Sequence, residues 1–172
     1  MNKKLKIWLK ITMIGALYTA LTLALSVLSF GPIQVRIAEA LTILPLLGFW
    51  PIWSLTLGCA LSNLFGAILG LNLLGYWDVL WGTLATLVAA LLTYRFRNIQ
   101  VKKLPLLSLV MPILINGVVV GLELTLVIGP NSLVTFLFYM GSVIIGEGIS
   151  VILFGLPLFQ FLKKINLFKT EV

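Results

Sequence analysis

The segment QVRIAEALTILPLLGFWP, residues 34–51, decides how often the chain crosses a membrane. Residues 37–70 form one apolar run that three helix-disfavouring residues interrupt: Pro45, Gly48 and Pro51. Proline breaks a helix from within, but it is well tolerated at a helix start. We therefore expect one helix to end near Gly48 and the next to begin at Pro51.

The composition is that of an integral membrane protein. Of the 172 residues, 60% are hydrophobic and 10% are charged, and the mean hydropathy is +1.15. Several apolar runs exceed the length of about 18 residues that marks a spanning helix. We predict an all-α membrane protein with one integral membrane domain over residues 1–172. The run over residues 11–30 is longer than the apolar part of a signal peptide, so we expect it to remain as a spanning helix.

Several classes of enzyme are excluded by residue content. Histidine is absent, which excludes zinc motifs of the HExxH type and a Ser-His-Asp triad. Cys59 is the single cysteine, which excludes an internal disulfide. The sequence GxxxxGK[ST], which binds ATP phosphates, is also absent. If the chain transports a solute uphill, a gradient or another subunit supplies the energy.

The basic residues predict the topology. Four precede the first apolar run, four lie between the fourth and fifth runs and three follow the last, which accounts for 11 of the 12. If residues 37–70 make two passes, all three clusters and both termini face the cytoplasm. The net charge of +7 then reflects topology and not a nucleic-acid partner. We expect six transmembrane helices, at about residues 7–30, 36–48, 51–70, 76–95, 104–128 and 132–162.

The second of these helices is short. About 13 residues at 1.5 Å each reach only about 20 Å, less than the thickness of the hydrocarbon core. Whether it crosses fully stays open.

Small residues recur every fourth position on two helices. One strip is Ala16, Ala20 and Ala24 on the first helix, and the other runs from Gly58 to Gly70 on the third. Such strips let helices approach closely in lipid, within one chain or between chains. The pattern alone does not separate these two uses.

Ionisable residues at membrane depth are costly and usually mark a ligand or ion path. Arg36 and Glu39 are three residues apart, the helical spacing at which opposite charges meet, so we expect a structural ion pair. Asp78, Glu123 and Glu147 have no basic residue at their expected depth. For Asp78, a role at a helix N-terminus is slightly favoured over ligand contact.

Buried carboxylates without cations must be protonated, face water or accept hydrogen bonds, so a donor-rich or cationic ligand would suit them. Trp8, Trp50, Trp53 and Trp77 are typical of the aromatic belts at the membrane boundaries. The predicted substrate-binding residues, all expected in the outer half of the bundle, are Glu39, Asn63, Asp78, Trp81, Asn116, Glu123, Tyr139 and Glu147.

Four blocks carry a resemblance to a known family: GALYTALTLAL, GPIQVRIAEALTILPLLGFWP, GCALSNLFG and LGYWDVLWGTLATLVAALLTYR. They resemble the QueT family of substrate-binding (S) components of energy-coupling factor transporters. The resemblance covers the first four helices, and the last two match mainly in hydropathy and in the position of the glutamates.

The resemblance implies a six-helix subunit of the plasma membrane that binds a vitamin-like substrate. Its partners would be a transmembrane coupling protein (the T component) and two cytoplasmic ATPases, which use the ATP, so the chain itself needs no cofactor. The strip of Ala16, Ala20 and Ala24 would contact the coupling protein. The implied substrate is a queuosine precursor, chiefly 7-aminomethyl-7-deazaguanine, which Glu123 and Glu147 would bind through its base edge and its ammonium, in an order left open.

Three alternatives remain. An S component for a corrinoid would need a wide apolar cavity and little carboxylate chemistry. A stand-alone proton-coupled carrier would relay protons through Glu123 and Glu147, although no inverted repeat is detectable. An intramembrane peptidase would need a catalytic pair of acids that the sequence does not offer.

Overall fold

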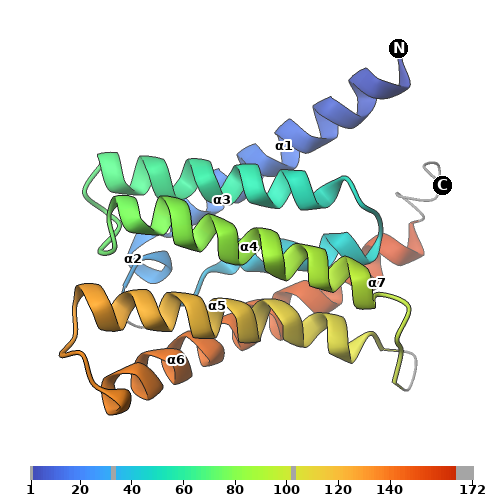
Figure 1. Ribbon diagram of the computed structural model, residues 1–172. Helices are drawn as coiled ribbons and strands as arrows, with labels where there is room; N and C mark the ends of the chain where they lie inside the picture. Colours follow the sequence, from blue (N-terminus) through green and yellow to red (C-terminus); the bar gives the residue numbers. More distant parts are fainter. Residues whose placement is uncertain (1, 32–33, 102–103, 166–172) are drawn as a thin grey trace.

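The computed structural model describes residues 2–31, 34–101 and 104–165. Within these ranges every regular secondary-structure element is a helix, as the sequence predicts (Figure 1). The elements are α1 (Lys3–Ala24), α2 (Ser26–Ser29), the 3-10 helix η1 (Ile37–Leu46), α3 (Pro51–Ile68), α4 (Tyr76–Phe96), α5 (Leu106–Val127), α6 (Leu133–Gly148), the π-helical segment η2 (Ile149–Gly155) and α7 (Leu156–Lys164).

Five helices of the described chain are long and apolar enough to cross a membrane. Four of them are α1, α3, α4 and α5, and the fifth is the continuous 32-residue run of α6, η2 and α7. The shortest, α3, has 18 residues, or about 27 Å at 1.5 Å per residue. Because lipid offers no hydrogen-bond partners, each segment satisfies its backbone internally as a helix.

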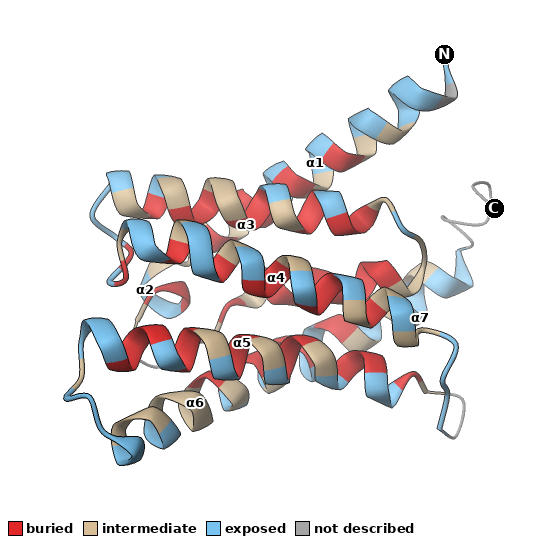
Figure 2. Cartoon of the chain, viewed as in Figure 1, coloured by how far each residue is buried: buried red, intermediate tan, exposed pale blue. Residues whose placement is uncertain are grey.

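The helices pack in the order α1, α3, α4, α5 and α6, each against the next. Neighbouring α3, α4 and α5 run in alternating directions, and α1 begins at the same end of the bundle at which α7 ends (Figure 1). Buried residues face the interior of the bundle and exposed apolar residues cover the outer faces (Figure 2). The outer surface is therefore suited to lipid.

The short η1 lies inside this arrangement. It contacts α1, α3, α4, α5, η2 and α7, and all eight residues from Ala38 to Pro45 are buried. Ten residues at about 2.0 Å each reach about 20 Å, so η1 is shorter than the hydrocarbon core. Small residues allow the neighbouring helices to pack closely around η1. For example, a methyl group added at Gly155 would lie only 3.1 Å from the Ala40 carbonyl oxygen.

The first two predicted helices differ most from the structure. The first helix ends at Ala24, and a separate four-residue α2 follows it. The second helix is a tight 3-10 helix over Ile37–Leu46 and not a regular helix over 36–48. Two features within this segment reduce regular α-helical hydrogen bonding. Pro45 has no N–H to donate, and the Thr42 hydroxyl donates to the Glu39 carbonyl oxygen at 2.6 Å.

The small-residue strip of α3 serves the internal fold. A Cβ added at Gly58 would lie 2.8 Å from the Tyr18 Cβ, and one at Gly66 would lie 2.7 Å from the Phe30 ring. Gly70 lies beyond the helix with a φ of 69° and takes no part in the packing. By contrast, the alanine strip of α1 is exposed at all three positions.

Gly146→Ala is expected to destabilise the protein strongly. A Cβ at this position would lie 1.7 Å from the Gln34 carbonyl oxygen, so the segment leading to Arg36 would have to move off α6. Overpacking of this kind usually costs about 1–3 kcal/mol. Thermal unfolding in detergent measures the loss.

Gly148→Ala is the matched control, because nothing lies within 4 Å of a Cβ there. In a helix this change is worth up to about 1 kcal/mol of added stability. Equal effects of the two substitutions would contradict the close crossing at Gly146.

Candidate functional site

A buried ion pair joins two distant parts of the sequence. Arg36 Nη2 lies 3.0 Å from Asp78 Oδ2, and the two side chains are 5% and 0% exposed. Asn72 Nδ2 donates to the same carboxylate oxygen at 2.8 Å. Asn63 Nδ2 donates to the Asp78 carbonyl oxygen at 2.8 Å, which fixes the start of α4 against α3.

The predicted ion pair between Arg36 and Glu39 is therefore wrong. The spacing of three residues presumes that both belong to one helical turn. Arg36 instead lies before η1 with an extended backbone, φ −87° and ψ 93°, so its side chain leaves the helix and reaches Asp78. The prediction that Asp78 has no cation at its depth is wrong for the same reason.

Arg36 is anchored further by its own segment. Its Nε donates to the Ser29 carbonyl oxygen at 3.3 Å, and its Cζ lies 5.3 Å from the centroid of the Phe30 ring. Arg36 is thus held by one carboxylate, one carbonyl oxygen and one aromatic ring.

Asp78 lies in the first turn of α4 but makes no capping hydrogen bond there. The residue before the helix is Gly75, whose φ of 59° turns the chain into α4. Gly82 leaves room for the carboxylate, because a Cβ at that position would lie 1.9 Å from Asp78 Oδ1. The side chain therefore anchors Arg36 from the predicted position at the N-terminus of a helix, where its charge also complements the helix dipole.

Two further acids each accept one hydrogen bond and keep one buried oxygen without a partner among the described residues. The Tyr18 hydroxyl donates to Glu39 Oε1, and Glu39 Oε2 has no such partner. Asn116 Nδ2 donates to Glu147 Oε1 at 2.9 Å, and Glu147 Oε2 has none.

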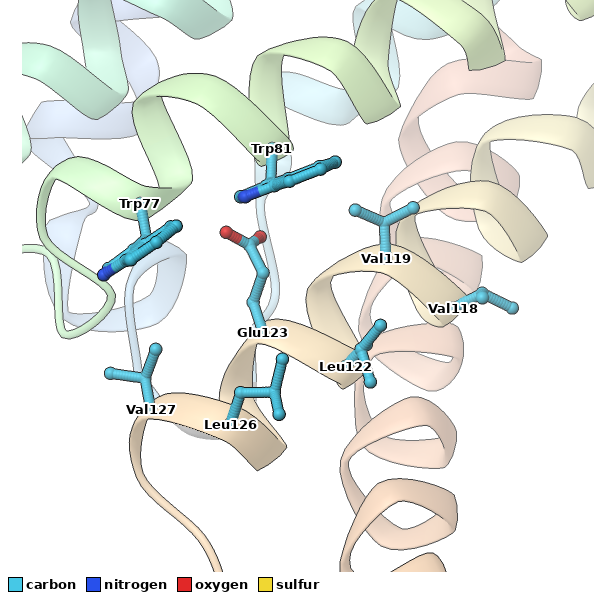
Figure 3. A pocket seen from close by; sticks show the side chains of 8 residues that line it. All are labelled: Trp77, Trp81, Val118, Val119, Leu122, Glu123, Leu126 and Val127. Carbon is cyan, nitrogen blue, oxygen red and sulfur yellow. The ribbon is translucent and has the colours of Figure 1, made fainter. Parts of the chain in front are cut away.

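Glu123 forms the floor of a groove between α4 and α5 (Figure 3). It is 6% exposed, and neither carboxylate oxygen has a hydrogen-bond partner among the described residues. In Figure 3 the carboxylate points towards α4, where the indoles of Trp77 and Trp81 flank it. The groove has a volume of about 470 Å³. Its lining residues are Trp77, Trp81, Val118, Val119, Leu122, Glu123, Leu126 and Val127.

The structure thus brings Trp81 and Glu123 together in one groove, and it places the other predicted site residues elsewhere. Asn63 and Asp78 belong to the ion-pair cluster, while Asn116 and Glu147 meet deeper in the bundle. Tyr139 does not line the groove but packs against a small apolar cluster that includes Leu124.

Sequence reasoning missed four residues with polar or aromatic roles near the acids. Tyr18 and Asn72 donate to Glu39 and Asp78, and Trp77 lines the groove instead of serving only as a boundary residue. The buried amide of Gln34 has no partner for its Nε2 among the described residues. Gln34 lies two residues before Arg36, and this nearness to a charged residue is the feature of the sequence that could have identified it.

Five spanning helices around a buried polar cluster, with a ligand-sized groove, define a multi-pass membrane protein suited to handling a small molecule. The family model of the QueT transporter matches residues 8–164, which is most of the chain. The chain belongs to the QueT transporter family and is a membrane transport protein. Neither the comparison with curated proteins nor the comparison with solved structures gives a match.

Proposed function

We propose that the chain is the substrate-binding component of an energy-coupling factor importer and that it binds a queuosine precursor such as 7-aminomethyl-7-deazaguanine. The observation that carries the substrate class is the Glu123 carboxylate. It is almost fully buried, both its oxygens lack partners among the described residues, and it lies beside Trp81 in a groove of about 470 Å³.

The chemistry of a guanine-like base matches this arrangement. Its ring N–H and exocyclic amine are parallel donors, which one carboxylate accepts through both oxygens. Stacking of the flat ring on an indole adds about 0.5–1.5 kcal/mol beyond the burial of area. The groove also falls within the range of about 300–1,000 Å³ that is usual for small-molecule sites.

The aminomethyl ammonium needs a second acceptor. Glu147 Oε2 is buried and has no hydrogen-bond partner among the described residues, so we assign the ammonium to Glu147. Glu147 does not line the groove in the ligand-free structure, so this assignment requires α5 and α6 to part when the ligand enters. Glu39, Asn63, Asp78 and Asn116 act as supporting residues, because they hold Tyr18, the start of α4, Arg36 and Glu147 in place.

Calorimetry on the purified chain tests the substrate class. Binding of 7-aminomethyl-7-deazaguanine that is tighter than that of guanine, with no binding of cobalamin, is the expected result. A corrinoid is the second candidate, but it is far larger than a deazaguanine and would not fit a groove of about 470 Å³ without a large rearrangement. Binding of cobalamin alone would therefore reverse the assignment.

Two observations support a coupling protein and two ATPases as partners: the source of energy and the exposed face of α1. No sequence for binding ATP phosphates is present, so the coupling protein and two ATPases supply the energy. Ala16, Ala20 and Ala24 are exposed and offer a flat strip for the coupling protein. Co-purification of ATPase subunits would distinguish this importer from a stand-alone proton-coupled carrier.

We place the chain in the plasma membrane with the short η1 as the second crossing. The chain then passes six times, and both termini face the cytoplasm. The basic residues at the ends of α4 and α7 lie at the same end as the start of α1, which supports this orientation.

Ala20→Trp is expected to abolish uptake while leaving substrate binding to the isolated chain intact. A tryptophan on the exposed strip would hold a partner helix away, but it would not enter the bundle. Uptake by cells that contain the whole importer, and calorimetry on the purified chain, give the two readouts.

Val88→Trp, on the exposed outer face of α4, is the matched control and should leave both readouts unchanged. Loss of binding in Ala20→Trp would show that the strip belongs to the internal fold. Unchanged uptake would place the coupling protein on another face.

A further inference from the structure

A polar cavity lies at the opposite end of the bundle from the ion-pair cluster. It has a volume of about 200 Å³ and lies where η1 ends, where the chain leaves α4 and where α7 ends. Two cations, Arg97 and Lys163, line it together with the amides of Asn98 and Gln100. Leu47 and Phe159 contribute an apolar wall. We call this site the basic-end pocket.

The acids of the bundle lie too far away to neutralise this pocket. Asp78 precedes Arg97 by 19 residues along α4, or about 28 Å at 1.5 Å per residue. Glu147 precedes Lys163 by 16 residues along the same continuous helical run, or about 24 Å. Glu123 lies near the other end of α5 from the pocket, and Glu39 precedes Leu47 by 8 residues, or about 16 Å at 2.0 Å per residue of a 3-10 helix.

Aromatic rings, and not acids, hold the two cations. Arg97 Cζ lies 4.0 Å from the centroid of the Tyr94 ring, and Lys163 Nζ lies 5.9 Å from that of Phe159. Within the described ranges, neither cation forms an ion pair. Both charges are therefore available to an anion that enters the pocket.

We propose that the basic-end pocket binds the phosphate headgroup of an anionic phospholipid. The pocket lies at the ends of apolar spanning helices, which is the level of the headgroups. Basic pockets between transmembrane helices are a recurring site for such headgroups. Arg97 and Lys163 face the phosphate, the two amides donate to its oxygens or to the headgroup, and Leu47 and Phe159 contact the glycerol and the first methylenes.

The apolar wall favours a lipid over a free phosphate ion, because a free ion gains nothing from contact with Leu47 and Phe159. Bound lipid would join segments that are far apart in sequence, namely the end of η1, the connection after α4 and the last turn of α7. This site is independent of the groove at Glu123 and of the substrate assigned to it.

The purified full chain tests the proposal. Phosphatidylglycerol added in detergent should raise the midpoint of thermal unfolding, and phosphatidylcholine should not. In the double variant Arg97→Gln/Lys163→Gln, the apparent affinity for phosphatidylglycerol should fall about 30-fold. Arg97→Lys keeps the charge and should retain most of that affinity.

Lys6→Gln/Arg95→Gln is the matched control, since it removes the same charge from exposed residues at the same end of the bundle. It should retain an affinity close to that of the unmodified chain. Equal losses in the two double variants would show diffuse attraction and overturn the site. Inorganic phosphate that stabilises the chain as well as phosphatidylglycerol does would overturn the assignment to lipid.

Discussion

Arg36→Met is expected to lower the free energy of unfolding by about 3–5 kcal/mol, the usual cost of removing one partner from a buried ion pair. The change leaves the Asp78 carboxylate fully buried without its cation, 3.0 Å from where Arg36 Nη2 had been. The hydrogen bond from Asn72 remains, but it does not neutralise the charge. Thermal unfolding in detergent, followed by tryptophan fluorescence, measures the loss.

The two partners of this ion pair should not be equivalent. Asp78→Asn keeps the size of the side chain, and Arg36 keeps its hydrogen bond to the Ser29 carbonyl oxygen and its contact with the Phe30 ring. We therefore expect Asp78→Asn to cost less than Arg36→Met, and the double variant to recover part of the loss. A greater cost for Asp78→Asn would show that the contacts with Ser29 and Phe30 do not stabilise the unpaired guanidinium.

Glu123→Gln is expected to weaken the binding of 7-aminomethyl-7-deazaguanine by about 10- to 150-fold. This range corresponds to about 1.5–3 kcal/mol, the contribution of hydrogen bonds to a charged group. Glutamine keeps the size of the side chain, but it offers one acceptor where the base edge needs two. Calorimetry on the purified chain measures the affinity.

The stability of the ligand-free protein should not fall in Glu123→Gln. The carboxylate accepts no hydrogen bond from the described residues, so the substitution breaks none. Loss of binding without loss of stability separates this variant from Arg36→Met, which should lose both. If Glu123→Gln binds the ligand normally, the proposed substrate class loses its main support.

Glu147→Gln tests which acid binds the ammonium and serves as a control for Glu123→Gln. If Glu147 holds the ammonium, the substitution weakens the aminomethyl ligand more than an uncharged deazaguanine. Glu123→Gln should weaken both ligands alike, because both present the same base edge. Equal losses of the two ligands in Glu147→Gln would move the ammonium to another residue.

Part of the candidate site could be predicted from the sequence because polar residues in an apolar helix are conspicuous. Glu123 was selected on that basis and Trp81 as an aromatic ring that could stack on a flat ligand, and the structure places the two in one groove. Trp77 was missed because its position near a helix start also suits a boundary tryptophan. Asn72 was missed because asparagine is common in turns and gives no sign of a distant partner.

The sequence by itself determined that this is an all-helical membrane protein, and it located the five long helices closely. The reason is local: runs of apolar residues must enter lipid, and lipid forces each run to satisfy its own backbone. Prolines and glycines near residue 48 also separated the second helix from the third, since their effect on the backbone depends only on their immediate neighbours.

Only the tertiary structure decided the partner of Arg36, the enclosure of η1 and the wall of the groove. Arg36 meets an acid 42 residues away because its backbone is extended and because Gly82 leaves room for the Asp78 carboxylate. Contacts of this kind depend on how several helices pack at once. Spacing along one helix cannot predict them, which is why the expected pair with Glu39 was wrong.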